Sequence, residues 1–155
     1  MWVHYAHHNK GLNKLENAIF YYEKAITLKK NLGNIERVFQ LYNSLGFIFY
    51  LQGHWQRAIH YYQDAMVYAY KTGDILEISL TYLNMGDAYA QMHDYQNAVE
   101  CFEKSLTLKS NIPNIEKVSG LHGMPKIFNS FSLSYAHSGN LEKAQEYISL
   151  CENCL

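Results

Sequence analysis

The feature that most constrains the fold is a segment that occurs three times at intervals of forty residues. The copies are NAIFYYEKAITLKKNLGN at 17–34, RAIHYYQDAMVYAYKTGD at 57–74 and NAVECFEKSLTLKSNIPN at 97–114. Each copy places alanine, an aromatic residue and a second small residue at offsets that share one face of a helix. Repetition at a period of this length is typical of arrays in which stacked repeats bury a continuous core.

A second pattern precedes each copy and supplies the helix against which the copy packs. YNSLGFIF at 42–49 matches YLNMGDAY at 82–89, with an apolar residue and a glycine between aromatic residues. A glycine inside a helix costs about 1 kcal/mol relative to alanine. Its recurrence at Gly46 and Gly86 therefore predicts a close crossing between a leading helix and the trailing helix that follows it.

Turn signals divide the chain into units. Stop and N-cap signals between units stand at Gly33-Asn34, Gly73-Asp74 and Pro113-Asn114, and breaks inside units fall near 52–54, 92–94 and 138–140. Asp74 and Glu77 have capping-box spacing, whereas Asn34 and Asn114 are expected to cap alone. The predicted repeats are 1–33, 34–73, 74–113 and 114–155, forming one domain over 1–155.

The first and last units depart from the pattern. Trp2, Tyr5 and Ala6 follow the leading-helix pattern, but Asn9 and Gly11 interrupt it, so we expect a degenerate helix pair in an array entered partway through.

In the last unit, Ala144, Ile148 and Cys151 align with the small, aromatic and small positions. An insertion at 119–127, with two glycines and a proline, is expected to break or kink the leading helix, and both a tolerated bulge and a recognition loop remain open. Polar Gln145 and Glu152 indicate a capping face.

Composition indicates a folded domain. Apolar residues make up 48% and charged residues 17%, and the net charge is −1 with scattered basic residues. We therefore expect neither nucleic acid nor an anionic membrane as partner. The longest apolar run, LGFIFYL at 45–51, is far too short to span a bilayer. Three cysteines without a paired framework favour a reducing compartment, so a cytoplasmic location is expected.

Few residues suggest chemistry. His4 and His8 have a spacing that suits a metal, but no third ligand is placed, and solvated or packed histidines are favoured. Cys151 and Cys154 form a C-x-x-C, yet Cys151 occupies a packing position. No phosphate-binding, zinc-protease or hydrolase motif occurs, so we expect no enzyme activity, no metal and no cofactor.

The aromatic, apolar-Gly, alanine and aromatic positions together resemble the tetratricopeptide repeat over almost the whole chain. The period of forty exceeds the family's usual 34, and the closing proline is missing at the first two junctions. The resemblance implies an all-α, right-handed superhelical solenoid of about four antiparallel helix pairs. The longer period implies longer helices, resembling the long-repeat arrays of bacterial peptide-sensing regulators and of some eukaryotic scaffolds.

The resemblance also implies a concave groove lined by leading helices and used to hold a partner protein or peptide. The groove positions carried over to this sequence are Asn43, Phe47, Tyr50, Leu83, Asn84, Asp87, Gln91, Asn129 and Leu133. No lysine or arginine occupies the groove positions of repeats two and three, which argues against a carboxylate clamp.

Two classes of function follow from these expectations. The first is a non-catalytic scaffold for a protein or peptide partner. The alternative is the peptide- or ligand-sensing regulatory domain of a bacterial signalling or transcription regulator. Self-association through the uncapped N-terminal end is a further expectation.

Overall fold

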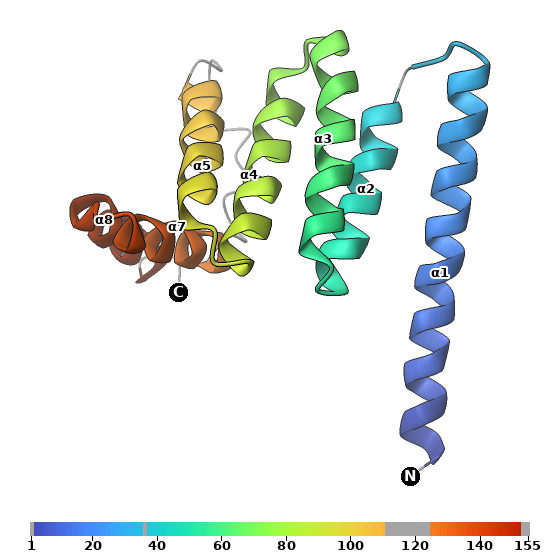
Figure 1. The fold of residues 1–155 in the computed structure, drawn as a ribbon, viewed down its shortest axis with the longest axis horizontal. Coiled ribbons are helices and arrows are strands. Elements are labelled where there is room, and N and C mark those ends of the chain that lie inside the picture. Colours follow the sequence, from blue (N-terminus) through green and yellow to red (C-terminus); the bar gives the residue numbers. More distant parts are fainter. Residues whose placement is uncertain (1, 36, 111–124, 153–155) are drawn as a thin grey trace. The chain divides into compact units, whose positions relative to one another are not determined.

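The structure is a computed structural model that describes residues 2–35, 37–110 and 125–152, without the side chains of 2–13, 110, 125–127 and 151. These ranges contain seven helices and no strand, which confirms the all-α class (Figure 1). The helices are α1 Trp2–Asn31, α2 Val38–Leu51, α3 Trp55–Thr72, α4 Ile75–Gln91, α5 Tyr95–Ser110, α7 Pro125–His137 and α8 Leu141–Glu152. The chain divides into two compact units, Met1–Tyr68 and Ala69–Leu155.

The breaks inside the units fall where the sequence predicts them. Residues 52–54, 92–94 and 138–140 separate α2 from α3, α4 from α5 and α7 from α8. A residue of positive φ stands two positions after the end of each leading helix; these residues are Gly53 at 76°, His93 at 60° and Gly139 at 84°. The next amide bonds back into the last turn, as between His54 and the Phe49 carbonyl at 2.9 Å. This left-handed residue closes the helix and reverses the chain.

Side-chain caps start three of the helices. Asp74, Asp94 and Asn140 each accept a hydrogen bond from the backbone N–H three residues later, at 3.1, 3.3 and 3.1 Å. The Asp74 cap receives this bond from Glu77, as its capping-box spacing predicts.

The predicted cap at Asn34 is wrong. The Asn34 amide closes α1 by donating to the Lys29 carbonyl at 3.0 Å, and α2 begins only at Val38. Arg37, at φ 61°, precedes α2 and makes no side-chain capping bond. The expected cap at Asn114 lies outside the described residues.

In the first unit, α2 and α3 cross closely at Gly46. A β-carbon added to Gly46 would lie 2.5 Å from two ring atoms of Tyr62, whose side chain is 1% exposed. Ala58 and Ala65, on the same face of α3, are fully buried. The glycine therefore allows the contact that its recurrence predicts.

The second unit repeats this contact and extends it into an aromatic core. A β-carbon on Gly86 would lie 2.4 Å from the Phe102 ring, and the Phe102 and Phe131 rings stack with centroids 3.8 Å apart. Tyr135 and Tyr147 continue the cluster, so that α4, α5, α7 and α8 share one core. Pro125 is the first residue of α7, a helical position that needs no N–H donor.

The expected helix pair within residues 1–33 does not form, because α1 runs unbroken from Trp2 to Asn31. The stop signals of the other repeats are absent here. Asn13 and Lys14 stand where Gly53 and His54 end α2 and lead into α3, and one glycine costs too little to end a helix. Ala18 is consequently half-buried, whereas the equivalent Ala58 and Ala98 are fully buried.

The aromatic position assigned to Ile148 is also wrong. Ala144 is buried as predicted, but Ile148 is 40% exposed, and Tyr147 at 8% takes its place in the core. Tyr147 packs against Phe131 and Tyr135 of α7, with ring centroids 4.7 and 5.6 Å apart. Gln145 and Glu152 are exposed, in keeping with their polar character.

Candidate functional site

The leading helix of the first unit presents an aromatic surface. Phe47 is 51% exposed, and its ring stacks on that of Tyr50 at a centroid distance of 6.4 Å and an interplanar angle of 9°. Leu51, one turn beyond Phe47, is 61% exposed, and Asn43 is half-buried one turn before it. The 3.6-residue period places these residues on one side of α2.

The leading helices of the second unit present a more polar surface. Asp87 of α4 accepts a hydrogen bond from the Ser130 hydroxyl of α7 at 2.5 Å, which ties the two helices together. Asn84 is half-buried and Gln91 is exposed on α4, while Asn129 and Leu133 are exposed on α7. Asp87 therefore has a role between repeats in addition to any role toward a partner.

Leu83 does not belong to this surface. Its side chain is 3% exposed and lies in the core with Ala98, Phe102 and Phe131. Because almost none of Leu83 reaches the surface, its assignment as an apolar groove contact is corrected.

A cavity of about 490 Å³ lies in the first unit between α1, α2 and α3, on the other side of α2 from Phe47. Buried Ile26 and Leu45 line it together with the rings of Tyr42 and Tyr61. Charged or titratable lining residues are Glu23 and Lys30 from α1 and His60 and Asp64 from α3.

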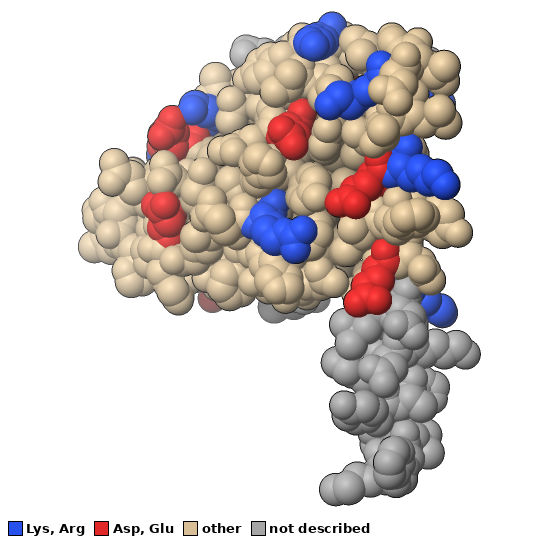
Figure 2. All heavy atoms as spheres, turned by 45° about the vertical axis from the view of Figure 1, so that its right-hand side comes forward, with Lys and Arg blue, Asp and Glu red and all other residues tan. Residues whose placement is uncertain are grey.

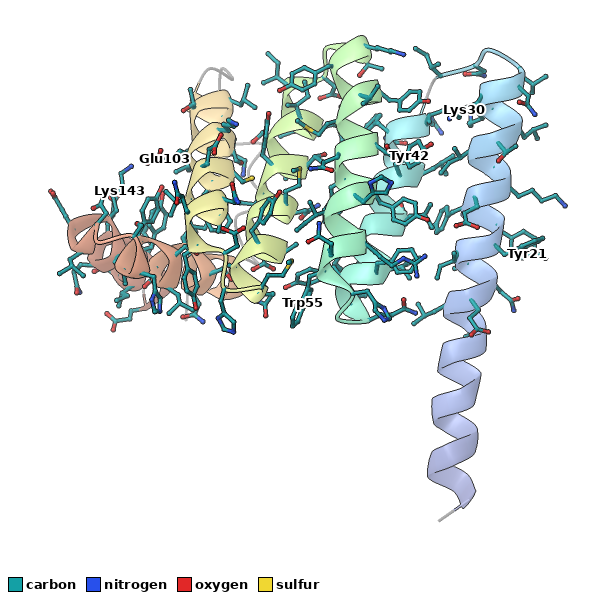
Figure 3. The ribbon with its side chains drawn as sticks, viewed as in Figure 1. Tyr21, Lys30, Tyr42, Trp55, Glu103 and Lys143 are labelled. Carbon is teal, nitrogen blue, oxygen red and sulfur yellow. The ribbon has the colours of Figure 1, made fainter. Side chains whose placement is uncertain are left out.

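Lys30 lines one end of the cavity. Its ammonium group lies beside the hydroxyls of Tyr42 and Tyr68, and attraction to these phenol oxygens, Tyr42 first, raises the pKa of Lys30. Figure 3 shows Lys30 and Tyr42 facing each other in the space between α1 and α2. Partial burial raises the pKa of Tyr42, so this phenol stays protonated and offers a hydroxyl.

Glu23 and Tyr61 line the other end of the cavity. The Tyr61 hydroxyl donates to Glu23 Oε1 at 3.1 Å, which joins α3 to α1. The Tyr61 ring stacks on Phe49 at 5.2 Å, and the guanidinium of Arg57 lies 4.0 Å from the Phe49 ring centroid. Burial, followed by the bond to Glu23, raises the pKa of Tyr61. On the rim, His60 Nε2 lies 3.9 Å from Asp64 Oδ2.

Sequence reasoning missed the cavity. The i,i+4 pair of His60 and Asp64 and the i,i+7 pair of Glu23 and Lys30 are visible in the sequence, but charges at these spacings are common on solvated helix faces. The cavity depends on how α1, α2 and α3 pack together, and no residue pattern within one helix specifies it.

The residues considered for metal or redox chemistry lie largely outside the described side chains, among them His4, His8, Cys151 and Cys154. Among the described residues no group of three or more His, Cys, Asp or Glu side chains is placed to hold a metal. Cys101 is a buried free thiol, and burial raises its pKa to about 11. A thiol of this kind is a poor nucleophile near neutral pH.

Stacked helix pairs with small residues and aromatics at their seams define an α-helical solenoid. The tetratricopeptide repeat pattern matches residues 1–32, 38–68 and 79–112, together more than half of the chain. The chain therefore belongs to the tetratricopeptide repeat family. Proteins built from this repeat generally mediate protein–protein interactions.

A solved structure supports the same fold. The crystal structure of BtubC (BKLC) from P. vanneervenii is similar, with a TM-score of 0.76 and 20% sequence identity, over 92% of this chain and 57% of that one. This chain thus spans less than two thirds of that chain, and at this identity the likeness concerns the fold alone. Comparison with curated proteins gives no match. None of the described helices is long and apolar enough to cross a membrane.

Proposed function

We propose that this protein is a non-catalytic scaffold that binds a segment of a partner polypeptide on its leading helices. The observation that carries this proposal is the stacked pair of Phe47 and Tyr50, with Phe47 51% exposed on α2. Aromatic side chains dominate the binding energy of many interfaces. Phe47 can act as such a side chain, because half of it is exposed and its ring is supported by stacking on Tyr50.

The polar side chains of the surface suit the backbone of an extended segment. Asn43, Asn84, Gln91 and Asn129 carry amides that both donate and accept hydrogen bonds, so they can bind peptide groups whatever the partner's sequence. The only formal charge among the candidate groove residues is the carboxylate of Asp87. This supports a partner that is not bound through a terminal carboxylate.

The surface charge also supports a protein partner over a nucleic acid. On the face shown in Figure 2, lysine and arginine atoms alternate with acidic atoms among the described residues. Nucleic acid binding depends on a basic patch that attracts the phosphate backbone.

Peptide-display selection on the purified protein, followed by calorimetric measurement of the enriched peptides, tests the proposal. We expect Phe47→Ala to weaken binding at least tenfold, which corresponds to about 1.4 kcal/mol. Phe20→Ala, at a ring that is 57% exposed on α1, is the matched control and should bind normally.

The Asn43→Ala/Asn84→Ala double variant should weaken binding while the helical circular dichroism is retained. Selected peptides that bind Phe47→Ala as tightly as the parent protein would move the site away from α2. A selection that enriches no binding peptide would also count against the proposal.

A further inference from the structure

The cavity of the first unit has the size and the lining of a binding site. Its volume of about 490 Å³ falls within the ~300–1,000 Å³ of ligand pockets. Ile26 and Leu45, 5% and 0% exposed, give it an apolar floor, and Tyr42 and Tyr61 give it aromatic walls. Six of the ten lining residues are polar or charged and surround this small apolar floor, so they can hold one polar or charged group in a fixed orientation.

The lining charges indicate which class of ligand the cavity accepts. Among the lining residues Glu23 and Asp64 are carboxylates and Lys30 is a cation, so these three side chains carry a formal charge of −1. A bound cation would neutralise this charge, whereas an anion would double it and a zwitterion would leave it unchanged. Coulomb energy in a partly enclosed site therefore favours a monocation.

The hydrogen bonds around the cavity point the same way. Lys30 is turned toward the hydroxyls of Tyr42 and Tyr68. Glu23 accepts a hydrogen bond from the Tyr61 hydroxyl at 3.1 Å, and a carboxylate has room for several donors. Asp64 faces His60 Nε2 at 3.9 Å, which is beyond hydrogen-bond distance. Both carboxylates can therefore accept N–H donors from an incoming cation.

The aromatic walls suit the same ligand. The chain already places a guanidinium on this cluster, because Arg57 lies 4.0 Å from the centroid of Phe49, and Phe49 stacks on Tyr61. Ring faces attract cations, and guanidinium groups stack on them especially well. The cavity side of Tyr42 and Tyr61 offers the same chemistry.

We propose that this cavity binds the arginine or lysine side chain of a partner polypeptide, with Glu23 and Asp64 receiving the cation and Tyr42 and Tyr61 flanking its stem. The site shares no residue with the Phe47 surface and lies on the other side of α2. It therefore stands or falls independently of the function proposed for the leading helices.

Titration of the isotope-labelled protein, followed by amide NMR shifts, tests this proposal with four probes. These are N-acetyl-arginine methylamide, its neutral citrulline isostere, butylguanidine as a free small monocation, and acetate as an anion. We expect the arginine probe to shift amides at the cavity and to bind at least five times more tightly than citrulline. Equal binding of arginine and citrulline, or tighter binding of acetate, would overturn the proposal.

Butylguanidine separates the two sources of such a cation, because it carries the same single charge as the capped arginine. A side-chain site should bind the capped arginine at least as tightly as butylguanidine. Butylguanidine binding more tightly than the capped arginine would overturn the polypeptide assignment and indicate a free small cation as the ligand.

Isosteric variants assign the carboxylates. Glu23→Gln and Asp64→Asn should each weaken the arginine probe about three- to tenfold, since each removes one charge-assisted contact. Lys30→Met, which removes the competing cation, should tighten binding. Glu142→Gln, at an exposed carboxylate on α8, is the matched control and should not change it. Unaltered affinity in both Glu23→Gln and Asp64→Asn would refute the site.

Discussion

Gly46→Ala tests the packing principle on which each helix pair depends. Two terms of opposite sign compete in this variant. Replacing a helical glycine by alanine stabilises a helix by about 1 kcal/mol. Against this, the new methyl carbon would lie 2.5 Å from two ring atoms of Tyr62 and 3.1 Å from a third.

The collision decides the sign, because the Tyr62 ring has nowhere to go. Its side chain is 1% exposed, so relief requires α2 and α3 to separate or the ring to leave its rotamer. Overpacking of this kind costs about 1–3 kcal/mol. The net expectation is a loss of about 1 kcal/mol in the free energy of unfolding.

Urea unfolding followed by circular dichroism measures this loss, and a second background isolates its cause. In Tyr62→Leu the ring is gone, so Gly46→Ala should become stabilising by about 1 kcal/mol, a coupling of about 2 kcal/mol between the two sites. Gln63→Gly and Gln63→Ala, at an exposed position of α3, calibrate the helix-propensity term. If Gly46→Ala stabilises the parent protein as much as the Gln63 pair predicts, the close crossing is not what the glycine serves.

Three further predictions follow from burial. Ala58→Leu, at a fully buried position, should lower the free energy of unfolding by about 1–3 kcal/mol. Ala18→Leu, at the half-buried equivalent position on α1, should lower it less. Equal losses in the two variants would contradict the difference in burial between the two repeats. The Tyr135 hydroxyl is buried with no hydrogen-bond partner among the described residues, so Tyr135→Phe should stabilise by about 1 kcal/mol, with exposed Tyr21→Phe as control. Burial also raises the pKa of Tyr135 to about 12. Because the phenol of the unfolded chain loses its proton near pH 10, the free energy of unfolding should fall as the pH rises from about 10 to about 12. This fall should be smaller in Tyr135→Phe. Self-association through α1 remains a prediction: if it occurs, the mass from light scattering will rise with concentration and Leu28→Glu, at a side chain 60% exposed, will abolish the rise.

The sequence pattern predicted the features that depend on residues close together in the chain, such as helix ends. The breaks at 52–54, 92–94 and 138–140 could be located because a left-handed stop must follow each leading helix. His93 shows how strongly the fold requires this conformation, since a non-glycine residue adopts φ 60° there. The close crossings were predictable as well, because a glycine that recurs at the same position inside two helices indicates a contact too tight for a side chain.

Residues whose environment depends on a neighbour that is missing or moved could not be predicted in this way. Alignment assigned Ile148 to the core, but α8 packs on α7 with Tyr147 instead, a choice set by the rotation of one helix against another. Similarly, Leu83 matches a groove position in the repeat and yet is buried. One position along a helix turns a side chain by about 100°, which is enough to exchange a surface residue for a core residue.

The candidate cavity shows the same limit most clearly. Glu23, Lys30, His60 and Asp64 are ordinary helix-surface residues when each helix is considered alone, and they become a site only where α1, α2 and α3 bring them around one cavity. In α1 the stop signal that would fold residues 1–33 into a pair is absent. The absence of this stop makes the first repeat degenerate. It also leaves α1 as one continuous helix, and this helix supplies Glu23 and Lys30 to the cavity. A variant with the stop restored, Asn13→Gly/Lys14→Asp, should place a helix end near residue 12 by amide NMR; if it also changes affinity for the arginine probe, the continuity of α1 and the cavity are physically linked.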